Sequence, residues 1–468
     1  MSRNTLLTTT ALLALALPGL AQAASCTSTI SGGNPVLICD TPASDPVSDA
    51  SDNLTVFVTA TGSVESSDRD DSPLELDGTN VTVENMGTIS ISDDRKNANA
   101  ITSLGENLTV NNTGTISSGD RAIHALDGFV GGLTVHNSGT ITSRRQTIRT
   151  EEAAPGSYIE NDGLISSLEG RAIQVRGQGS TVINRGTIEG GEEVIEARDD
   201  FTLYNYGSIR LRDDIEDEDG TQLASGQVYN YGLIQGSDDG VDIDEGEIFN
   251  YATGQIISTG PEGAGIDVDG EFDNSRDTPR PANPLLVENA GYIEGRYAIG
   301  ADEAATSEIT VINSGTLYGR SGRAVDFAPG QGNSAIKLTG NSSVIGDILY
   351  GAGDDLLTID SLTSGTISTG VIDGSDGFDK VDLASYLMAD LLSFELDGDL
   401  VDLTLQTSNG VVAGQFLNFE FWSFGDGSEY TTAGLASLYS VSQVPLPAGL
   451  SLLATAFGGL IIARRRKG

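Results

Sequence analysis

The side chains in this sequence that could carry out chemistry are carboxylates that recur at fixed places in short apolar runs. Asp242 and Asp244 alternate with apolar residues in the run Val-Asp-Ile-Asp, and Asp267 and Asp269 do the same in Ile-Asp-Val-Asp. Arg198 lies on the same register after an earlier run of this type. Two neighbouring carboxylates can act as acid and base in glycoside hydrolysis, and calcium held by carboxylates beside a basic residue can support elimination. One interpretation is therefore a polysaccharide lyase or hydrolase that uses these five residues.

The same carboxylates have two interpretations without catalysis. Glu196 and Asp326 occupy the place of Asp242 in other runs, and all of these positions are expected to face outward. Stacked carboxylates repel one another unless a cation or a proton lies between them. The row is then either a solvated acidic face or a ladder of calcium ions. A deep groove beside the row would favour an enzyme and a flat face would count against one, and the candidate lining residues are Tyr204, Tyr206 and Tyr229.

Two glycine- and aspartate-rich segments are further candidates for metal binding. Gly351–Leu357 and Gly374–Val381 each resemble a calcium-binding glycine-rich nonapeptide, with one glycine missing. Asp355 and Asp379 would be the ligands, because calcium prefers carboxylate and carbonyl oxygens. The two segments are one full repeat apart rather than adjacent, so ordinary Gly-Asp corners are the alternative. We therefore expect either no cofactor or calcium.

These residues are positioned by a repeat that runs through most of the chain. Each copy has an Asn, in most copies a Gly two residues later, and an Ile or Leu two residues after that. A spacing of about 20 to 30 residues with tolerated insertions is typical of a solenoid. We expect the Gly to supply a positive φ in a turn, and the Asn amides to stack into a ladder along the axis. The repeating asparagines are Asn85, Asn112, Asn137, Asn161, Asn184, Asn205, Asn230, Asn250, Asn289 and Asn313.

Each repeat predicts one coil of a parallel β-helix. A β-prone run precedes the Asn, a second follows the Gly, and the run that carries the carboxylates is the third strand. Stacking of coils at about 4.8 Å buries a continuous core of Val, Ile and Leu. The predicted fold is therefore all-β, a right-handed parallel β-helix (β-solenoid) of about 10–12 coils. An N-terminal signal peptide and a single C-terminal hydrophobic helix are expected to flank it.

The charge and the cysteines indicate the compartment. The chain of 468 residues holds 67 Asp and Glu residues against 25 Lys and Arg residues, for a formal net charge of −42. This acidity argues against nucleic-acid binding and against adsorption to anionic lipid. Residues 1–24 have the weakly basic start, apolar run and small-residue cleavage site of a secretory signal peptide. The chain has two cysteines, Cys26 and Cys39, and in an oxidising exterior we expect them to pair.

Residues 444–468 form a second targeting segment. The pentapeptide Val444, Pro445, Leu446, Pro447 and Ala448 precedes an apolar stretch, and together they are just long enough to span a bilayer. The basic end, which should remain cytoplasmic, is Arg464, Arg465, Arg466 and Lys467. This arrangement resembles the VPLPA-type C-terminal sorting signal, a relative of the PEP-CTERM signals. The resemblance implies an exosortase-type enzyme as a partner, a transient inner-membrane tether, and cleavage near the pentapeptide that leaves the protein at the cell surface or outside the cell.

The repeat region resembles autotransporter-like β-helical passenger and adhesin segments. The resemblance implies a non-enzymatic cell-surface protein that serves adhesion or association with an extracellular matrix or biofilm, with extracellular polysaccharide or a neighbouring cell surface as the partner. The expected organisation is a signal peptide (1–24), an N-terminal cap with Cys26 and Cys39 (25–50), β-helix repeats (51–345), Gly/Asp-rich terminal coils (346–383), a C-terminal cap and linker (384–443) and the sorting signal (444–468).

Overall fold

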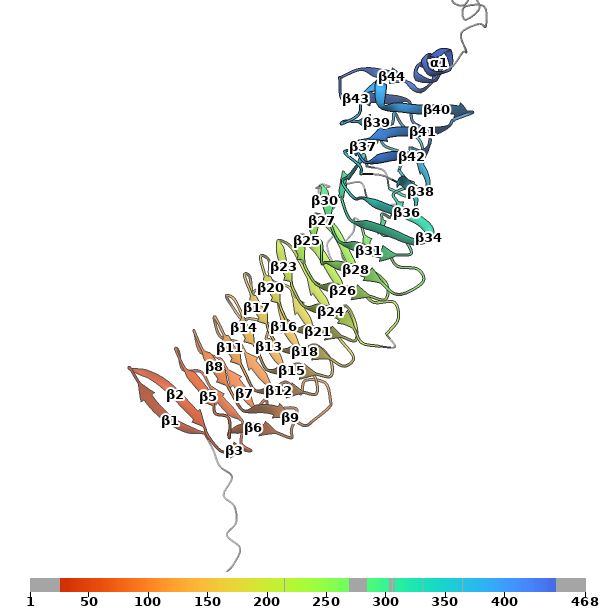
Figure 1. Cartoon of the computed structure of the whole chain (residues 1–468). Helices are drawn as coiled ribbons and strands as arrows, with labels where there is room; N and C mark the ends of the chain where they lie inside the picture. Colours follow the sequence, from red (N-terminus) through yellow and green to blue (C-terminus); the bar gives the residue numbers. More distant parts are fainter. Residues whose placement is uncertain are drawn as a thin grey trace, which may run out of the picture.

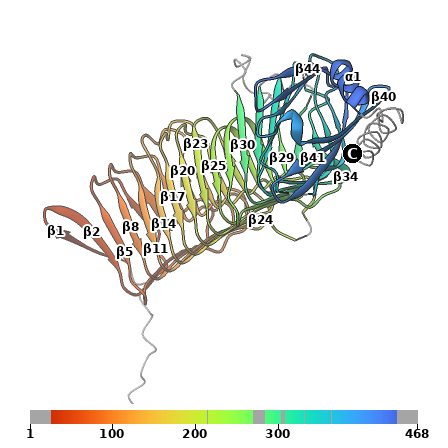
Figure 2. The same cartoon turned by 45° about the horizontal axis from the view of Figure 1, so that its top comes forward.

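The structure, a computed structural model, describes residues 26–442 except 214, 269–283, 303–304, 306–307, 331 and 364. The signal peptide, Asp269 and the sorting signal predicted above lie outside the described residues. The described chain winds into an all-β solenoid of about 13 turns, which confirms the predicted fold class with slightly more coils than expected. Figures 1 and 2 show the coils stacked along one axis.

The coils are built from three columns of parallel strands. The first column is β2 (Asn34–Cys39), β5 (Thr55–Val58), β8 (Thr82–Asn85), β11 (Thr109–Asn112), β14 (Thr134–Asn137), β17 (Tyr158–Asn161), β20 (Thr181–Asn184), β23 (Phe201–Asn205), β25 (Thr221–Asn230), β27 (Val241–Asn250), β30 (Leu285–Asn289), β33 (Ile309–Asn313), β35 (Ser334–Thr339), β37 (Leu356–Asp360), β39 (Lys380–Leu383) and β43 (Phe421–Phe424).

The second and third columns complete each coil. The second column is β3 (Pro42–Ala43), β6 (Ser63–Ser66), β9 (Thr88–Ile91), β12 (Thr115–Ser118), β15 (Thr140–Ser143), β18 (Leu164–Ser167), β21 (Thr187–Gly190), β24 (Ser208–Leu211), β26 (Leu233–Gly236), β28 (Gln255–Ser258), β31 (Tyr292–Gly295), β34 (Thr316–Asp326), β36 (Ser343–Leu349), β38 (Gly365–Asp373) and β42 (Gly410–Leu417). The third column is β4 (Val47–Asp49), β7 (Leu74–Leu76), β10 (Ile101–Ser103), β13 (Ile123–Ala125), β16 (Ile148–Thr150), β19 (Ile173–Val175), β22 (Ile195–Ala197), the first halves of β25 and β27, β29 (Ile266–Asp267), β32 (Ile299–Gly300) and the end of β34.

Alternation along each strand separates the core from the surface. In β14, Val135 and Asn137 are buried while Thr134 and His136 are half-buried. Equivalent residues pair in register from coil to coil, so that Val135 lies between Val110 and Ile159. A one-residue slip would turn every apolar side chain to the outside, and the pattern therefore fixes the register.

The repeating asparagines form the predicted ladder inside this core. Each amide Nδ2 donates to the Oδ1 of the asparagine one coil further on, at 2.7–2.9 Å, from Asn85 through to Asn313. The last amide, that of Asn313, donates to Ser342 Oγ at 2.7 Å. The ladder passes the long insertion between Asn250 and Asn289 without a break, because those two residues pair directly.

The glycine of the repeat is needed for a different reason from the one expected. The predicted positive φ is wrong for Gly114, Gly139 and Gly163, which are not among the left-handed residues. A Cβ on Gly139 would instead lie 2.2 Å from the carbonyl oxygen of Gly114, and one on Gly163 would lie 2.1 Å from that of Gly139. The backbones of successive coils come too close at this corner for any side chain.

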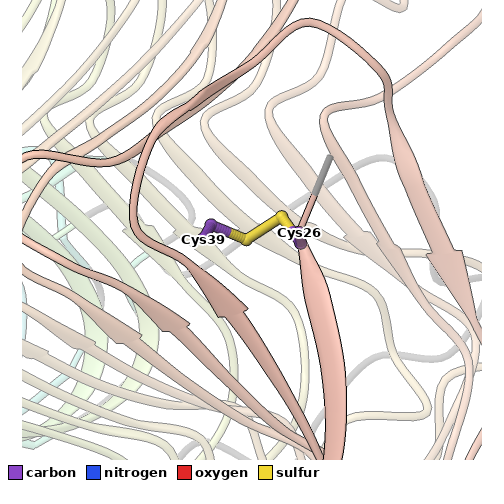
Figure 3. Close-up of a disulfide and its surroundings, with 2 residues drawn as sticks. All are labelled: Cys26 and Cys39. Carbon is purple, nitrogen blue, oxygen red and sulfur yellow. A yellow bond between two sulfur atoms is a disulfide. The ribbon is translucent and has the colours of Figure 1, made fainter. Parts of the chain in front are cut away.

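The two ends of the solenoid differ in structure. At the N-terminal end, β1 (Thr27–Ser31) pairs antiparallel with β2, and a disulfide joins Cys26 to Cys39 (Figure 3). At the C-terminal end, β40 (Leu391–Asp397) and β41 (Leu400–Thr407) continue antiparallel from β42, and β44 (Glu429–Thr431) pairs with β43. The 3-10 turn η1 (Met388–Asp390) and the helix α1 (Thr432–Ser442) complete this cap. Within the described residues, no helix has the length and apolar character needed to cross a membrane.

Replacing one asparagine of the ladder should lower the free energy of unfolding by an amount that depends on whether the residue lies in the middle or at the end of the ladder. Asn161→Ala removes the acceptor of Asn137 and the donor to Asn184 in a fully buried place, so we expect it to lower the free energy of unfolding by about 2–4 kcal/mol. Asn85→Ala, at the end of the ladder above Val58, breaks one such bond and should cost roughly half as much. Urea unfolding followed by far-ultraviolet circular dichroism measures both, and equal costs would contradict this account of the ladder.

Candidate functional site

The predicted row of acidic residues exists on the third strands. Glu196 pairs with Gln222, Gln222 with Asp242, and Asp242 with Asp267, while Asp326 lies further along the same row. The alignment of the repeats from sequence therefore identified equivalent positions correctly, and Asp242 and Asp267 are neighbours in adjacent coils.

The expected solvated acidic face is wrong for three members of this row, whereas Asp267 is half-buried. Glu196, Asp242 and Asp326 are only 8%, 6% and 4% exposed, although the apolar residues beside them face the core. Each carboxylate is covered by the polar side chains that reach it. Glu196 accepts from Gln174 Nε2 at 2.6 Å, Asp242 accepts from Gln222 Nε2 at 3.1 Å, and Asp326 pairs with the guanidinium of Arg323 at 2.8 Å.

Of the other residues predicted for catalysis, Asp244 lies two residues after Asp242 on β27, Asp269 is outside the described residues, and Arg198 belongs to an earlier coil. Arg198 follows Ala197, which pairs with Leu223, and Leu223 pairs with Ile243, so Arg198 stands two coils below Asp244. That separation is about 10 Å along the axis. The guanidinium of Arg198 lies 3.6 Å from Glu152. Among the described residues, the structure thus brings together Asp242 and Asp267 but not the full set proposed for catalysis.

The tyrosines expected to line a groove lie in the first column or at the turn just after it, away from the carboxylates of the third column. Two rows of aromatic rings flank the asparagine ladder, one just before the Asn and one just after it. Their ring centroids are 4.0–5.1 Å apart and their planes lie within 12° of parallel. The rows are Tyr204, Tyr229 and Phe249, and Tyr206, Tyr231 and Tyr251.

A cluster of carboxylates that the sequence analysis missed lies at the corner before the third strand. Three successive coils each carry two adjacent acidic residues there: Glu192 and Glu193, Glu218 and Asp219, and Asp238 and Asp239. Carboxylate oxygens of Asp219, Asp238 and Asp239 all lie within 4.8 Å of one another. In the sequence, an acidic pair precedes the third strand in each of these three coils. The comparison of repeats covered only the strand residues and therefore did not include these pairs.

Burial and mutual repulsion make this corner hard to ionise. Burial raises the pKa of Asp219 to about 7, despite the hydrogen bond that Asp239 N–H donates to it. Burial, with the charges of Glu193 and Glu192 adding to it, raises the pKa of Glu218 to about 7. The pKa of Asp239 is raised further by burial and by the charges of Asp267 and Asp219. Arg171 forms ion pairs in the lowest coil, where it contacts Glu192 at 2.9 Å and Glu193 at 2.7 Å, and its charge offsets only part of the rise in the pKa of Glu218. The upper two pairs can hold shared protons or a hard divalent cation.

Asp355 and Asp379 link successive terminal coils through hydrogen bonds to backbone N–H groups. Asp355 Oδ1 accepts the Ser334 N–H at 2.6 Å, Asp379 Oδ1 accepts the Asp355 N–H at 2.9 Å, and Glu420 accepts the Asp379 N–H at 2.8 Å. Each carboxylate therefore ties its own coil to the one before it. Burial raises the pKa of Asp355 to about 6 and that of Asp379 to about 7. The buried Oδ2 of each has no hydrogen-bond partner, which leaves room for a proton or a cation.

A polar hollow of about 440 Å³ lies beside the second strands of the early coils. Arg144 crosses it and pairs with Asp94 at 3.1 Å and with Glu169 at 2.9 Å. Hydroxyl groups supply much of the remaining lining, and the buried Oγ of Ser118 has no hydrogen-bond partner. Such a surface can exchange hydrogen bonds with a polar ligand. The lining hydroxyl residues are Ser92, Ser117, Ser118, Thr142 and Ser143.

No family model, curated protein or solved structure matches this chain. We therefore infer the function of the protein from the arrangement of its own residues.

The acidic corner predicts that the protein loses stability as pH rises. Groups with a raised folded pKa stabilise the fold fully below their unfolded values near 4, and that stabilisation disappears as pH rises through 7 and above. We expect the free energy of unfolding to fall by about 2–4 kcal/mol between pH 6.5 and pH 8.5, measured in chelator so that no cation replaces the protons; Asp379, whose pKa is also raised to about 7, adds to the same trend. His124, whose pKa burial lowers, opposes this trend only below its unfolded pKa of about 6.5, outside that range.

The matched variant for this test is Asp239→Asn. The amide oxygen can keep accepting the Ala264 N–H, and the charge is removed. We expect the variant to be more stable than the parent at pH 8.5 and to depend less steeply on pH. If the free energy of unfolding of the variant depended on pH as steeply as that of the parent, the acidic corner would not be the cause of the pH dependence.

Proposed function

We propose that this protein is an exported, non-enzymatic β-solenoid that adheres to extracellular polysaccharide. The observation that carries the proposal is the pair of stacked aromatic rows on coils β23 to β27. Tyr206 is 48% exposed, and the other members of the rows are partly exposed. Stacked rings lose little further freedom on binding, and tyrosine offers an apolar body with a polar tip. The ring edges and hydroxyl groups that such rows leave open suit a ligand that combines apolar ring faces with many hydroxyl groups.

The solenoid supports this role by holding its contacts in a fixed array. The buried ladder and the paired sheets fix the spacing between coils, so surface side chains repeat at regular intervals along the rod. A polysaccharide repeats along its length as well. Several weak contacts can then act together, because each one raises the effective concentration for the next. The polar hollow around Arg144 is a second candidate contact.

The charge of the chain favours an uncharged polysaccharide as the ligand. The formal net charge of −42 repels anionic polymers over a distance set by the ionic strength. Near the aromatic rows, Gln227 bonds to both Glu247 and Tyr229, which gives a polar margin able to exchange hydrogen bonds with sugar hydroxyls. We therefore expect the protein to bind a neutral glycan more tightly than an anionic one.

We test this proposal by binding of the exported chain to neutral and anionic polysaccharides, using affinity electrophoresis or calorimetry. The double variant Tyr206→Ala, Tyr231→Ala should bind the neutral polymer about 30-fold more weakly, because each of the two aromatic contacts is worth about 1 kcal/mol. Ser138→Ala, at the same turn position three coils away, is the control and should bind normally.

Two results would contradict adhesion through these rows. One is full binding by the double tyrosine variant. The other is saturable cleavage of a polymer that Asp242→Ala and Asp267→Ala abolish, since this would establish the alternative, a lyase or hydrolase.

Export and sorting complete the proposal. The support comes from the signal-like residues 1–24 and the Val-Pro-Leu-Pro-Ala segment with its basic end. We expect protein from native cell fractions to begin near residue 25 and to end near Val444–Ala448, without Arg464–Lys467. Mass spectrometry of the termini checks this, and an intact basic end on the surface-exposed protein would contradict processing by an exosortase-type enzyme.

A further inference from the structure

The N-terminal tip of the solenoid ends in an exposed sheet edge. Among the described residues, β1 pairs only with β2, through five residue pairs from Thr27 with Ile38 to Ser31 with Asn34. Figure 1 shows β1 as the outermost strand at this end. All five residues of β1 are exposed, and Ile30 is 75% exposed. The second edge of β1 therefore presents backbone N–H and C=O groups to the surroundings.

The tip lacks the features that usually protect a sheet edge. Natural edge strands avoid new pairings with charged side chains, proline, bulges or a covering segment. The segment from Cys26 to Cys39 contains no charged residue, although a fifth of the whole chain is charged. Its one proline, Pro35, lies on β2, and β1 itself is the β-prone sequence Thr-Ser-Thr-Ile-Ser. The rod thus carries an uncharged end on a strongly acidic body.

The edge is held in a fixed position. The disulfide between Cys26 and Cys39 ties the start of β1 to the end of β2, with Cα atoms 4.4 Å apart (Figure 3). Cys39 is buried in the core, and Val56 on the next coil pairs with Leu37 of β2. A strand that is already extended and braced loses little conformational entropy when it gains a partner.

The opposite end of the rod is blunted. There, α1 packs against β40 and β44, Trp422 is fully buried, and its Nε1 donates to Thr432 Oγ1 at 2.9 Å. Figure 2 shows the helix lying across this end. The two ends therefore differ, and a self-complementary contact through the N-terminal tip joins copies in pairs.

We propose that two copies of this protein associate tip to tip, with β1 of one copy pairing antiparallel with β1 of the other. A two-fold axis makes such a contact self-complementary. With Thr29 on the axis, Thr29 faces its counterpart and Ile30 faces Ser28 of the second copy. The tip is a region where two acidic bodies can meet without bringing charged side chains together, and salt strengthens the dimer by screening the bodies from each other. The proposal is independent of the polysaccharide ligand.

Sedimentation analysis of the exported chain tests the proposal across a range of concentrations and salt. Five paired residues make a small interface of the weak, transient class, so we expect a monomer–dimer equilibrium that is populated below ~0.5 mM. Raising the salt concentration should shift it toward the dimer. Thr29→Lys should weaken the dimer at least about tenfold, because like charges would face each other across the axis. Ser138→Lys, an exposed residue in the body of the rod, is the matched control and should dimerise as the parent does.

A charge-swap mixture makes the test specific. Thr29→Lys and Thr29→Glu should each be largely monomeric alone, and an equimolar mixture should recover the dimer, because opposite charges then face each other. Unchanged circular dichroism and an intact disulfide establish that each variant is folded. A chain that stays monomeric to ~0.5 mM, a dimer unaffected by Thr29→Lys, or growth beyond dimers would each overturn the proposal.

Discussion

The structure depends on one constraint, which is that a primary amide buried in an apolar core must find partners. Asn161 is fully buried, and its amide bonds to asparagines in the coil before and in the coil after. An unpaired amide at that depth would cost several times what one hydrogen bond contributes, so a coil that slips by one residue is strongly disfavoured. The aliphatic core would tolerate many small shifts. The amide ladder allows one register, and it holds that register even across the 39-residue step from Asn250 to Asn289.

Once the register is fixed, surface side chains at equivalent positions of successive coils must also stack on one another. This explains why aromatic rings lie face to face in rows, an arrangement that is favourable. It also explains why carboxylates lie next to one another at one corner, although they repel. The acidic pairs from Glu192 to Asp239 cannot move apart without breaking the alignment of the strands that follow them. The fold therefore converts a repetitive sequence into a repetitive surface, and both the aromatic rows and the strained acidic corner follow from the same alignment.

The fold could be predicted from the sequence because its period is explicit. The spacing of Asn and Gly gave the coils, the ladder and the pairing of Asp242 with Asp267. The burial of Glu196 could not be foreseen, because it depends on how Arg171 and Gln174 of the neighbouring coil fold over it, and the repeat spacing does not fix side-chain conformations. The role of Gly139 was misjudged because a turn residue is usually explained by its own φ, whereas here the close approach of Gly114 in the neighbouring coil decides it. The acidic corner was missed because it lies between the strands, where the alignment carries less information.

The most direct test of this account is the axial distance between turns that are far apart in sequence. Ser138 and Ser314 each follow a ladder asparagine, and seven amide bonds separate their coils. Spin labels on Ser138→Cys and Ser314→Cys can be introduced, because the two native cysteines are joined in a disulfide. Pulsed electron resonance should give one narrow distance of about 34 Å, which is seven coils at about 4.8 Å each. A broad distribution, or a mean distance far from this value, would contradict a stack of coils held in register by the asparagine ladder.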